Sequence, residues 1–239
     1  MSRLTEKDFS NIKDEIQNGR LTMSGMRVYL IGLFAYSGFL VGLSFAVANG
    51  NMVGWDNLSD NWHVIYYIEA VLLVIHLFII CLCWAKNSLN QRVLSIAMIL
   101  FTYKTALDQF LTMSMFLKDN QVFDQFIPLL LMIIVSGFIL HIVILVKWIK
   151  GISKKEFEEK NSKKSSKSGI WVSGIFLLAV LTGIIIRNDL LGAYDNFFGI
   201  FVISVVYLGL LIGACEFIIA AYCVFRYPSF SVKNFKNKK

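Results

Sequence analysis

Six long apolar runs constrain this chain of 239 residues more than any other feature. Each is about 17 residues or longer, enough for an α-helix to cross the roughly 30 Å apolar core of a bilayer. The runs extend from Arg27 to Ala48, Trp62 to Trp84, Val93 to Leu117, Phe126 to Ile149, Ile170 to Ile186 and Phe197 to Phe225. Helices of soluble proteins show apolar stripes instead of such runs. The sequence therefore predicts an all-α integral membrane protein, a bundle of six transmembrane helices.

Lysine and arginine residues surround these runs unevenly. Of the 23 such residues, 20 fall at the two chain ends or in the connections after the second and fourth runs. Only Lys118 and Arg187 flank the runs on the other side, and Lys104 lies within the third run. Basic residues gather on the cytoplasmic side of membrane proteins. The pattern predicts that both termini are cytoplasmic, and it explains the net charge of +7 without nucleic-acid binding.

The polar segments divide the chain into five parts. They are a cytoplasmic amphipathic segment (1–26), transmembrane helices one to four (27–149), a loop rich in Lys and Ser (150–168), helices five and six (169–226) and a basic cytoplasmic tail (227–239). In the first part, Phe9, Ile12 and Ile16 share one face of a short predicted helix. We expect this helix to lie at the membrane interface, the alternative being a solvated helix folded against the bundle.

The long basic loop is the one segment for which a specific binding partner, anionic lipid, can be named. From Lys147 to Lys167 it carries eight lysines among serines and glutamates. Such a segment can bind anionic lipid headgroups, and the alternative is a flexible linker that only sets topology. A protein partner is conceivable but its identity is unknown, and nothing indicates a cofactor.

Four ionisable residues inside the runs are the main candidates for function. Charged side chains are costly in a bilayer and face protein or water. On the second run Glu69 and His76 share a face, and on the third run Lys104 and Asp108 are four residues apart. Counted along the helices at about 1.5 Å per residue, the four lie at similar depth. We therefore expect Glu69, His76, Lys104 and Asp108 to meet between the two helices.

This expected cluster has two interpretations. It could line a polar pathway for a proton, an ion or a small solute. It could instead be a structural charge network in which Lys104 neutralises Glu69 and Asp108 and fixes the pairing of the helices. Two carboxylates and one lysine leave an excess negative charge, which a proton, His76 or a bound cation could balance. The secondary candidates for a polar role are Tyr66, Gln109, His141 and Glu216.

Small residues at helical spacing predict close helix packing. Gly38 and Gly42 lie on the first run, and Gly209 and Gly213 form a G-x-x-x-G pattern on the last. Such spacing lets two helix backbones approach each other. We expect these glycines to pack within the bundle, with dimerisation as the alternative.

The sequence offers little sign of enzyme chemistry. His76 and Cys83 have a spacing that would suit a nucleophile and its base, but no third group supports them. Metal-binding, phosphate-loop and serine-hydrolase motifs are absent. We expect a non-enzymatic protein without a metal. The leading hypothesis is transport of a small solute, proton or ion, and the alternative is a membrane interaction protein, either an accessory subunit or an immunity-type protein.

Overall fold

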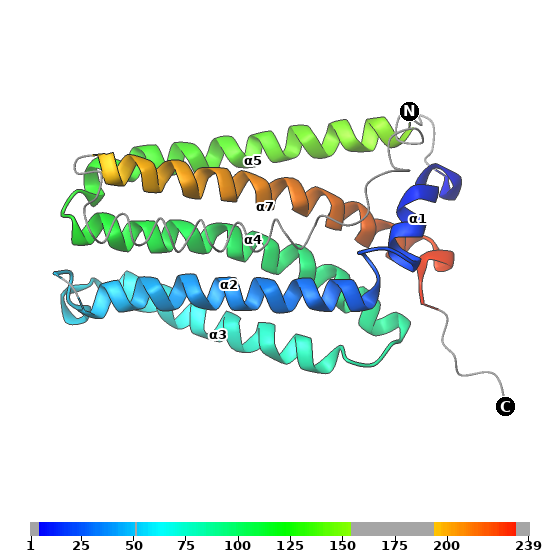
Figure 1. Ribbon diagram of the computed structural model, residues 1–239, viewed down its shortest axis with the longest axis horizontal. Coiled ribbons are helices and arrows are strands. Elements are labelled where there is room, and N and C mark those ends of the chain that lie inside the picture. The colour runs from blue at the N-terminus through cyan, green and yellow to red at the C-terminus, as the bar shows by residue number, and fades with distance from the viewer. Residues whose placement is uncertain (1–4, 51, 154–193, 233–239) are drawn as a thin grey trace.

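The structure is a computed structural model in which residues 5–50, 52–153 and 194–232 are described. The described residues form six α-helices and short 3-10 turns. The long helices lie side by side in a bundle, and the short helix α1 crosses one end of it (Figure 1). The α-helices are α1 (Ser10–Gln17), α2 (Met23–Gly50), α3 (Asp60–Leu82), α4 (Ser88–Asp119), α5 (Phe123–Ser153) and α7 (Asp195–Arg226), and the 3-10 turns are η1 (Glu6–Phe9), η2 (Trp55–Asn57) and η4 (Pro228–Phe230).

Four of the long helices, α2, α3, α5 and α7, are long and apolar enough to cross a membrane. They cover the first, fourth and sixth predicted runs and the second run as far as Leu82, so these four predictions are confirmed as candidate spans. Many large apolar side chains of α3 and α5 point outward, including Val74, Phe78, Met132 and Ile139. A soluble monomer rarely exposes apolar surface of this extent, whereas a bilayer solvates it. The protein is therefore best described as a multi-pass membrane protein.

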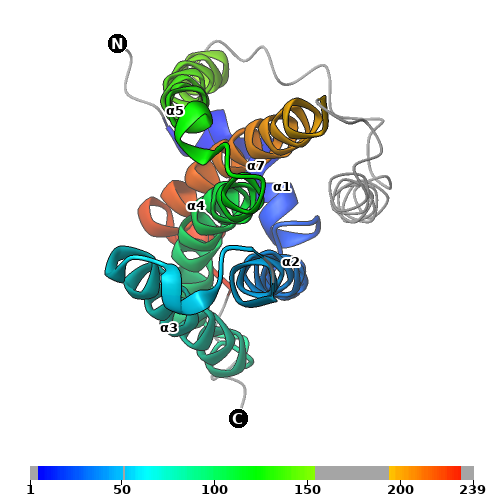
Figure 2. The same cartoon turned by 90° about the vertical axis from the view of Figure 1, so that its left-hand side faces the viewer.

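Helix α4, which contains the third predicted run, lies in the middle of the bundle (Figure 2). It contacts α2, α3, α5 and α7. It is the most polar of the long helices, and residues such as Gln91, Thr102 and Asp108 are almost fully buried. A polar helix is costly against lipid, and neighbouring apolar helices remove that cost by surrounding it. The fifth predicted run, residues 170–186, lies outside the described residues.

The N-terminal segment folds against the bundle. Phe9 and Ile16 are each 3% exposed and belong to the same apolar core as Met26 of α2, Leu94 of α4 and Val224 of α7. The ring of Phe9 packs against Tyr222 and Tyr227, with centroids 5.9 and 5.8 Å apart. The helical prediction is confirmed, but the apolar face is buried in protein. The expectation that this face lies in the membrane interface was therefore wrong. The alternative, a helix folded against the bundle, is the one observed, because α7 and η4 cover the face.

The ends of the helices reproduce the charge asymmetry of the sequence. Apart from Lys104 and Lys118, the described lysines and arginines lie at the end of the bundle that carries α1, η4 and the end of α5. Helices α5 and α7 run in the same direction, from the end with Lys118 towards this basic end (Figure 1). The end of α5 and the start of α7 therefore lie at opposite ends of the bundle.

Candidate functional site

Lys104 of α4 is the centre of a buried charge cluster. Its ammonium group donates hydrogen bonds to Ser37 Oγ and Asp108 Oδ2, both at 2.8 Å, and forms an ion pair with Glu69. The Ser37 hydroxyl donates to Asp108 Oδ2 at 2.6 Å. We call Ser37, Glu69, Lys104 and Asp108 the Lys104 cluster. It joins α2, α3 and α4, and it confirms the expectation that Glu69, Lys104 and Asp108 meet.

The Lys104 cluster lies near the middle of the bundle's length. Ser37 and Lys104 are each about 20 to 24 Å from both ends of their helices, at 1.5 Å per residue. The side chain of Asp108 is 1% exposed, Lys104 8% and Glu69 15%. If the long helices cross a bilayer, these charges lie well inside its apolar core of roughly 30 Å. Their mutual contacts then offset the free-energy cost of burying these charges in the apolar core.

The charges of the Lys104 cluster do not balance. An ammonium group has three N–H donors, and those of Lys104 meet Ser37, Asp108 and Glu69. Two carboxylates against one ammonium leave a formal charge of −1 when both are ionised. Asp108 Oδ1 is buried and makes no hydrogen bond among the described residues. A buried, uncompensated negative charge is costly, so this site favours uptake of a proton or a cation.

Ser37 was not singled out from the sequence. It lies on α2 in the buried series Leu30, Leu33, Ser37, Leu40, Ser44, which follows helical periodicity. Its side chain is 0% exposed. The periodicity could have placed it on the inner face, but the partner of a serine on that face depends on how α2 is rotated against α4.

His76 is buried on α3 but does not join the Lys104 cluster. Its ring stacks on Phe101, with centroids 3.7 Å apart and planes at 12°, and meets Phe34 edge-on at 5.5 Å. Neither ring nitrogen makes a hydrogen bond of ordinary geometry among the described residues, although the ring lies near the backbone of Leu30. The structure therefore places His76 in an aromatic layer below the cluster, about 10 Å along the helix from Glu69.

A second polar group joins α4, α5 and α7. His141 Nδ1 lies 2.8 Å from the carbonyl oxygen of Leu211, and Nε2 lies 2.6 Å from the Tyr103 hydroxyl. A carbonyl only accepts, so Nδ1 carries the hydrogen, and in the neutral ring Nε2 accepts from Tyr103. Cys215 Sγ is 3.3 Å from Nδ1. Because Nδ1 is already protonated, it cannot take a proton from the Cys215 thiol, and this arrangement suits packing rather than nucleophilic catalysis.

The other secondary candidates lie apart from one another. The Tyr66 hydroxyl donates to Ser44 at 3.0 Å. Gln109 is 1% exposed, and neither amide atom has a hydrogen-bond partner among the described residues. Glu216 pairs with Arg20, at 2.5 Å, at the basic end of the bundle. Of these residues, only Gln109 is adjacent to the Lys104 cluster in sequence, next to Asp108.

Close packing of a glycine occurs at a position that sequence spacing did not indicate. A Cβ atom at Gly137 of α5 would collide with the ring of Tyr207 on α7. A Cβ atom at each of the predicted packing positions would meet no atom of another described helix within 4 Å; these are Gly38, Gly42, Gly209 and Gly213. Within the described part of the chain, those four glycines are therefore not points of close helix contact.

Most of the predicted lipid-binding loop, beyond Ser153, lies outside the described residues. Among the residues that are described, no three His, Cys, Asp or Glu side chains are grouped to hold a metal ion. Comparison of the chain with known protein families, with curated proteins and with solved structures found no match.

Proposed function

We propose that this protein spans the membrane six times with both termini in the cytoplasm. The charge asymmetry supports the orientation, because basic residues near span ends favour the cytoplasmic side. The common direction of α5 and α7 supports a further crossing between them, and residues 170–186 have the length and apolarity for it. Helix α4 would be the third crossing, shielded from lipid by its neighbours.

A thiol-labelling experiment tests this topology. In a variant without the four native cysteines, single changes Asn57→Cys and Asn120→Cys should react with an impermeant maleimide added outside intact cells. Ser88→Cys and Ser165→Cys should react only after the membrane is opened. Labelling of Ser165→Cys from outside would refute the six-span arrangement.

Within this topology, the protein binds and exchanges a proton or a small cation at the Lys104 cluster, as part of transport across the membrane. The observation that carries this proposal is the unbalanced charge. Asp108 is buried, has one unpaired carboxylate oxygen and shares a single ammonium with Glu69. An intramembrane carboxylate of this kind is typical of ion and proton pathways.

The test compares Asp108→Asn with Asp124→Asn in liposomes, with proton, sodium and potassium flux as readouts. Both changes remove one carboxylate, but Asp124 is an exposed residue in the first turn of α5. We expect Asp108→Asn to remain folded and lose flux, because an amide keeps the shape but cannot hold a proton or a cation charge. Asp124→Asn should transport like the wild type. Unaltered flux through folded Asp108→Asn would contradict the proposal.

One observation favours a second candidate, a non-enzymatic interaction protein. All three donors of Lys104 are already used within the bundle, so the cluster also serves as a clamp between α2, α3 and α4. Absence of wild-type flux for every ion tested, together with strong destabilisation when Lys104 is removed, would favour this role. The occupied Nδ1 of His141 supports a non-enzymatic role in either case.

A further inference from the structure

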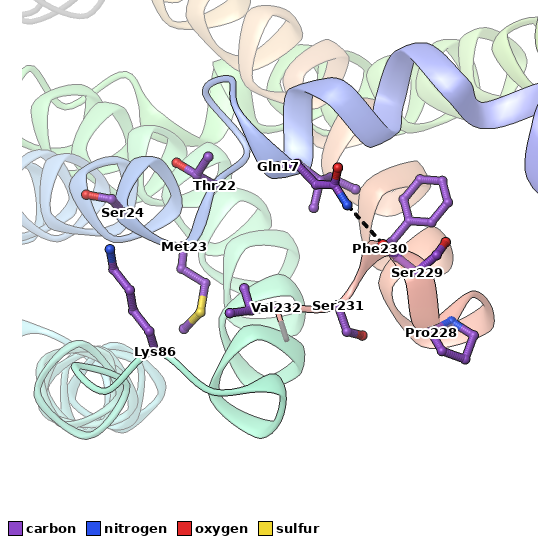
Figure 3. A pocket seen from close by; sticks show the side chains of 11 residues that line it. Gln17, Thr22, Met23, Ser24, Lys86, Pro228, Ser229, Phe230, Ser231 and Val232 are labelled. Carbon is purple, nitrogen blue, oxygen red and sulfur yellow. Dashed lines mark hydrogen bonds between the residues drawn. The ribbon is translucent and has the colours of Figure 1, made fainter. Parts of the chain in front are cut away.

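A pocket of about 470 Å³ opens at the basic end of the bundle. Figure 3 shows its walls, which come from the start of α2, the connection between α3 and α4, and η4. Four apolar side chains, Ile16, Met23, Phe230 and Val232, line one part of it. The polar residues of the lining are Gln17, Thr22, Ser24, Lys86, Ser229 and Ser231. The hydroxyl of Ser229 already donates to the carboxylate of Glu6, and that of Ser231 to the carbonyl of Val224.

Hydrogen bonds of the side chains of Gln91 and Gln17 hold these walls in place. Gln91 is 0% exposed, accepts from the backbone N–H of Val232 at 2.7 Å and donates to the carbonyl of Phe230 at 3.3 Å. Gln17 donates to the carbonyl of Ser229 at 3.0 Å. These bonds tie η4 and the chain after it to α1 and α4. The pocket is therefore preformed rather than a gap between loose ends.

The connection that carries Lys86 is also fixed. Arg27 donates to the carbonyl of Trp84 at 2.9 Å and lies over its ring, 5.2 Å from the centroid. This contact holds the α3–α4 connection against the start of α2. In Figure 3 the ammonium end of Lys86 points towards Ser24. None of the ion pairs among the described residues includes Lys86.

We propose that this pocket binds a phosphate group, with Lys86 as the counter-charge and Ser24 as a hydroxyl donor. The ammonium of Lys86 and the hydroxyl of Ser24 suit an anion with several acceptor oxygens. The start of α2 adds partial positive charge to that of Lys86. The apolar side of the pocket suits an apolar body attached to the phosphate. The pocket lies where the apolar spans end, which is the level of lipid headgroups, and basic pockets at this level bind anionic lipids.

Lipid binding to the purified full-length protein in detergent, followed by native mass spectrometry, tests the site. The probes are phosphatidylglycerol, phosphatidylcholine and inorganic phosphate. The variants are Lys86→Gln and Ser24→Ala, and the matched control is Lys7→Gln. Lys7 is an exposed lysine at the same end of the bundle, on η1, and it belongs neither to the pocket lining nor to the predicted lipid-binding loop. All four proteins are first compared by circular dichroism, so that a folding defect is recognised.

We expect Lys86→Gln to weaken phosphatidylglycerol binding about fivefold, the effect of losing one lysine near an anionic headgroup. Ser24→Ala should weaken it about three- to fivefold. Lys7→Gln should stay within about twofold of the wild type. Millimolar inorganic phosphate that displaces the lipid would support the site and assign it to a soluble phosphate compound. Failure to displace it, with the two variant effects present, would assign it to the lipid. Equal effects of Lys86→Gln and Lys7→Gln, or equal binding of the two lipids, would overturn the proposal.

Discussion

Replacing Lys104 with methionine tests how strongly the buried charges hold the bundle together. Methionine keeps a similar length but removes the ammonium that contacts Ser37, Glu69 and Asp108. Removing one partner of a buried ion pair costs about 3–5 kcal/mol, because an uncompensated charge remains. Here two carboxylates lose their counter-charge, but Glu69 is 15% exposed and can relax. We expect Lys104→Met to lower the free energy of unfolding by about 3 kcal/mol.

A second change shows whether the loss arises from charge. Lys104→Met combined with Asp108→Asn removes both partners of the pair that is separated by one helical turn. The double variant should recover about half of the lost stability, because only Glu69 then lacks a counter-charge. The control is Lys150→Met, an exposed lysine outside the ion pairs of the described residues, which should change stability by less than about 0.5 kcal/mol.

The assay is reversible unfolding in mixed detergent micelles, followed by circular dichroism as the denaturing detergent fraction rises. All four proteins are measured at the same pH and ionic strength. A Lys104→Met variant within about 0.5 kcal/mol of the wild type would refute the argument that the charges are mutually dependent. A double variant less stable than the single one would show that Asp108 is stabilised by contacts other than Lys104.

Two further predictions concern packing and the N-terminal segment. Gly137→Ala should lower the free energy of unfolding by about 1–3 kcal/mol, because the new methyl group collides with the buried ring of Tyr207. Gly209→Ala is the control and should be tolerated in the same assay. Equal losses of stability in the two variants would contradict this argument. The hydroxyl of Ser229, followed by Lys13, holds the pKa of Glu6 below its usual range. Because the folded pKa of Glu6 is the lower one, this contact stabilises docking of η1 and α1 against η4 above the unfolded pKa. The stabilisation is lost as the pH falls through the folded pKa. Hydrogen exchange of residues 6–17, corrected for the intrinsic rate, should therefore become faster in acid. Ser229→Ala should reduce this pH dependence. An unchanged pH dependence in Ser229→Ala would refute the attribution of the Glu6 pKa shift to Ser229.

The features that the sequence by itself determined are those that depend on one helix at a time. Four apolar runs became α2, α3, α5 and α7, and the helices end within a few residues of the expected ends. The preference of an apolar side chain for lipid over water depends on that residue and its neighbours in sequence, so it can be read from one run at a time. Lys104 and Asp108 had to be neighbours, because residues four apart share a helix face. The contact of Glu69 with Lys104 was expected because the two residues lie at similar depth along their helices. A buried carboxylate needs a counter-charge at the same depth in the membrane.

Tertiary structure decided everything that depends on how the helices are rotated and which ones touch. Rotation of α2 brings Ser37 to Asp108, and rotation of α3 turns His76 onto Phe101 instead of into the Lys104 cluster. The contact between α5 and α7 requires a glycine at position 137, although its spacing gave no sign of this. Likewise, an amphipathic face on α1 suits both a membrane and a protein surface. Only the presence of η4 and α7 beside it decided that Phe9 and Ile16 are covered by protein, because hydropathy records how apolar a face is and not what covers it.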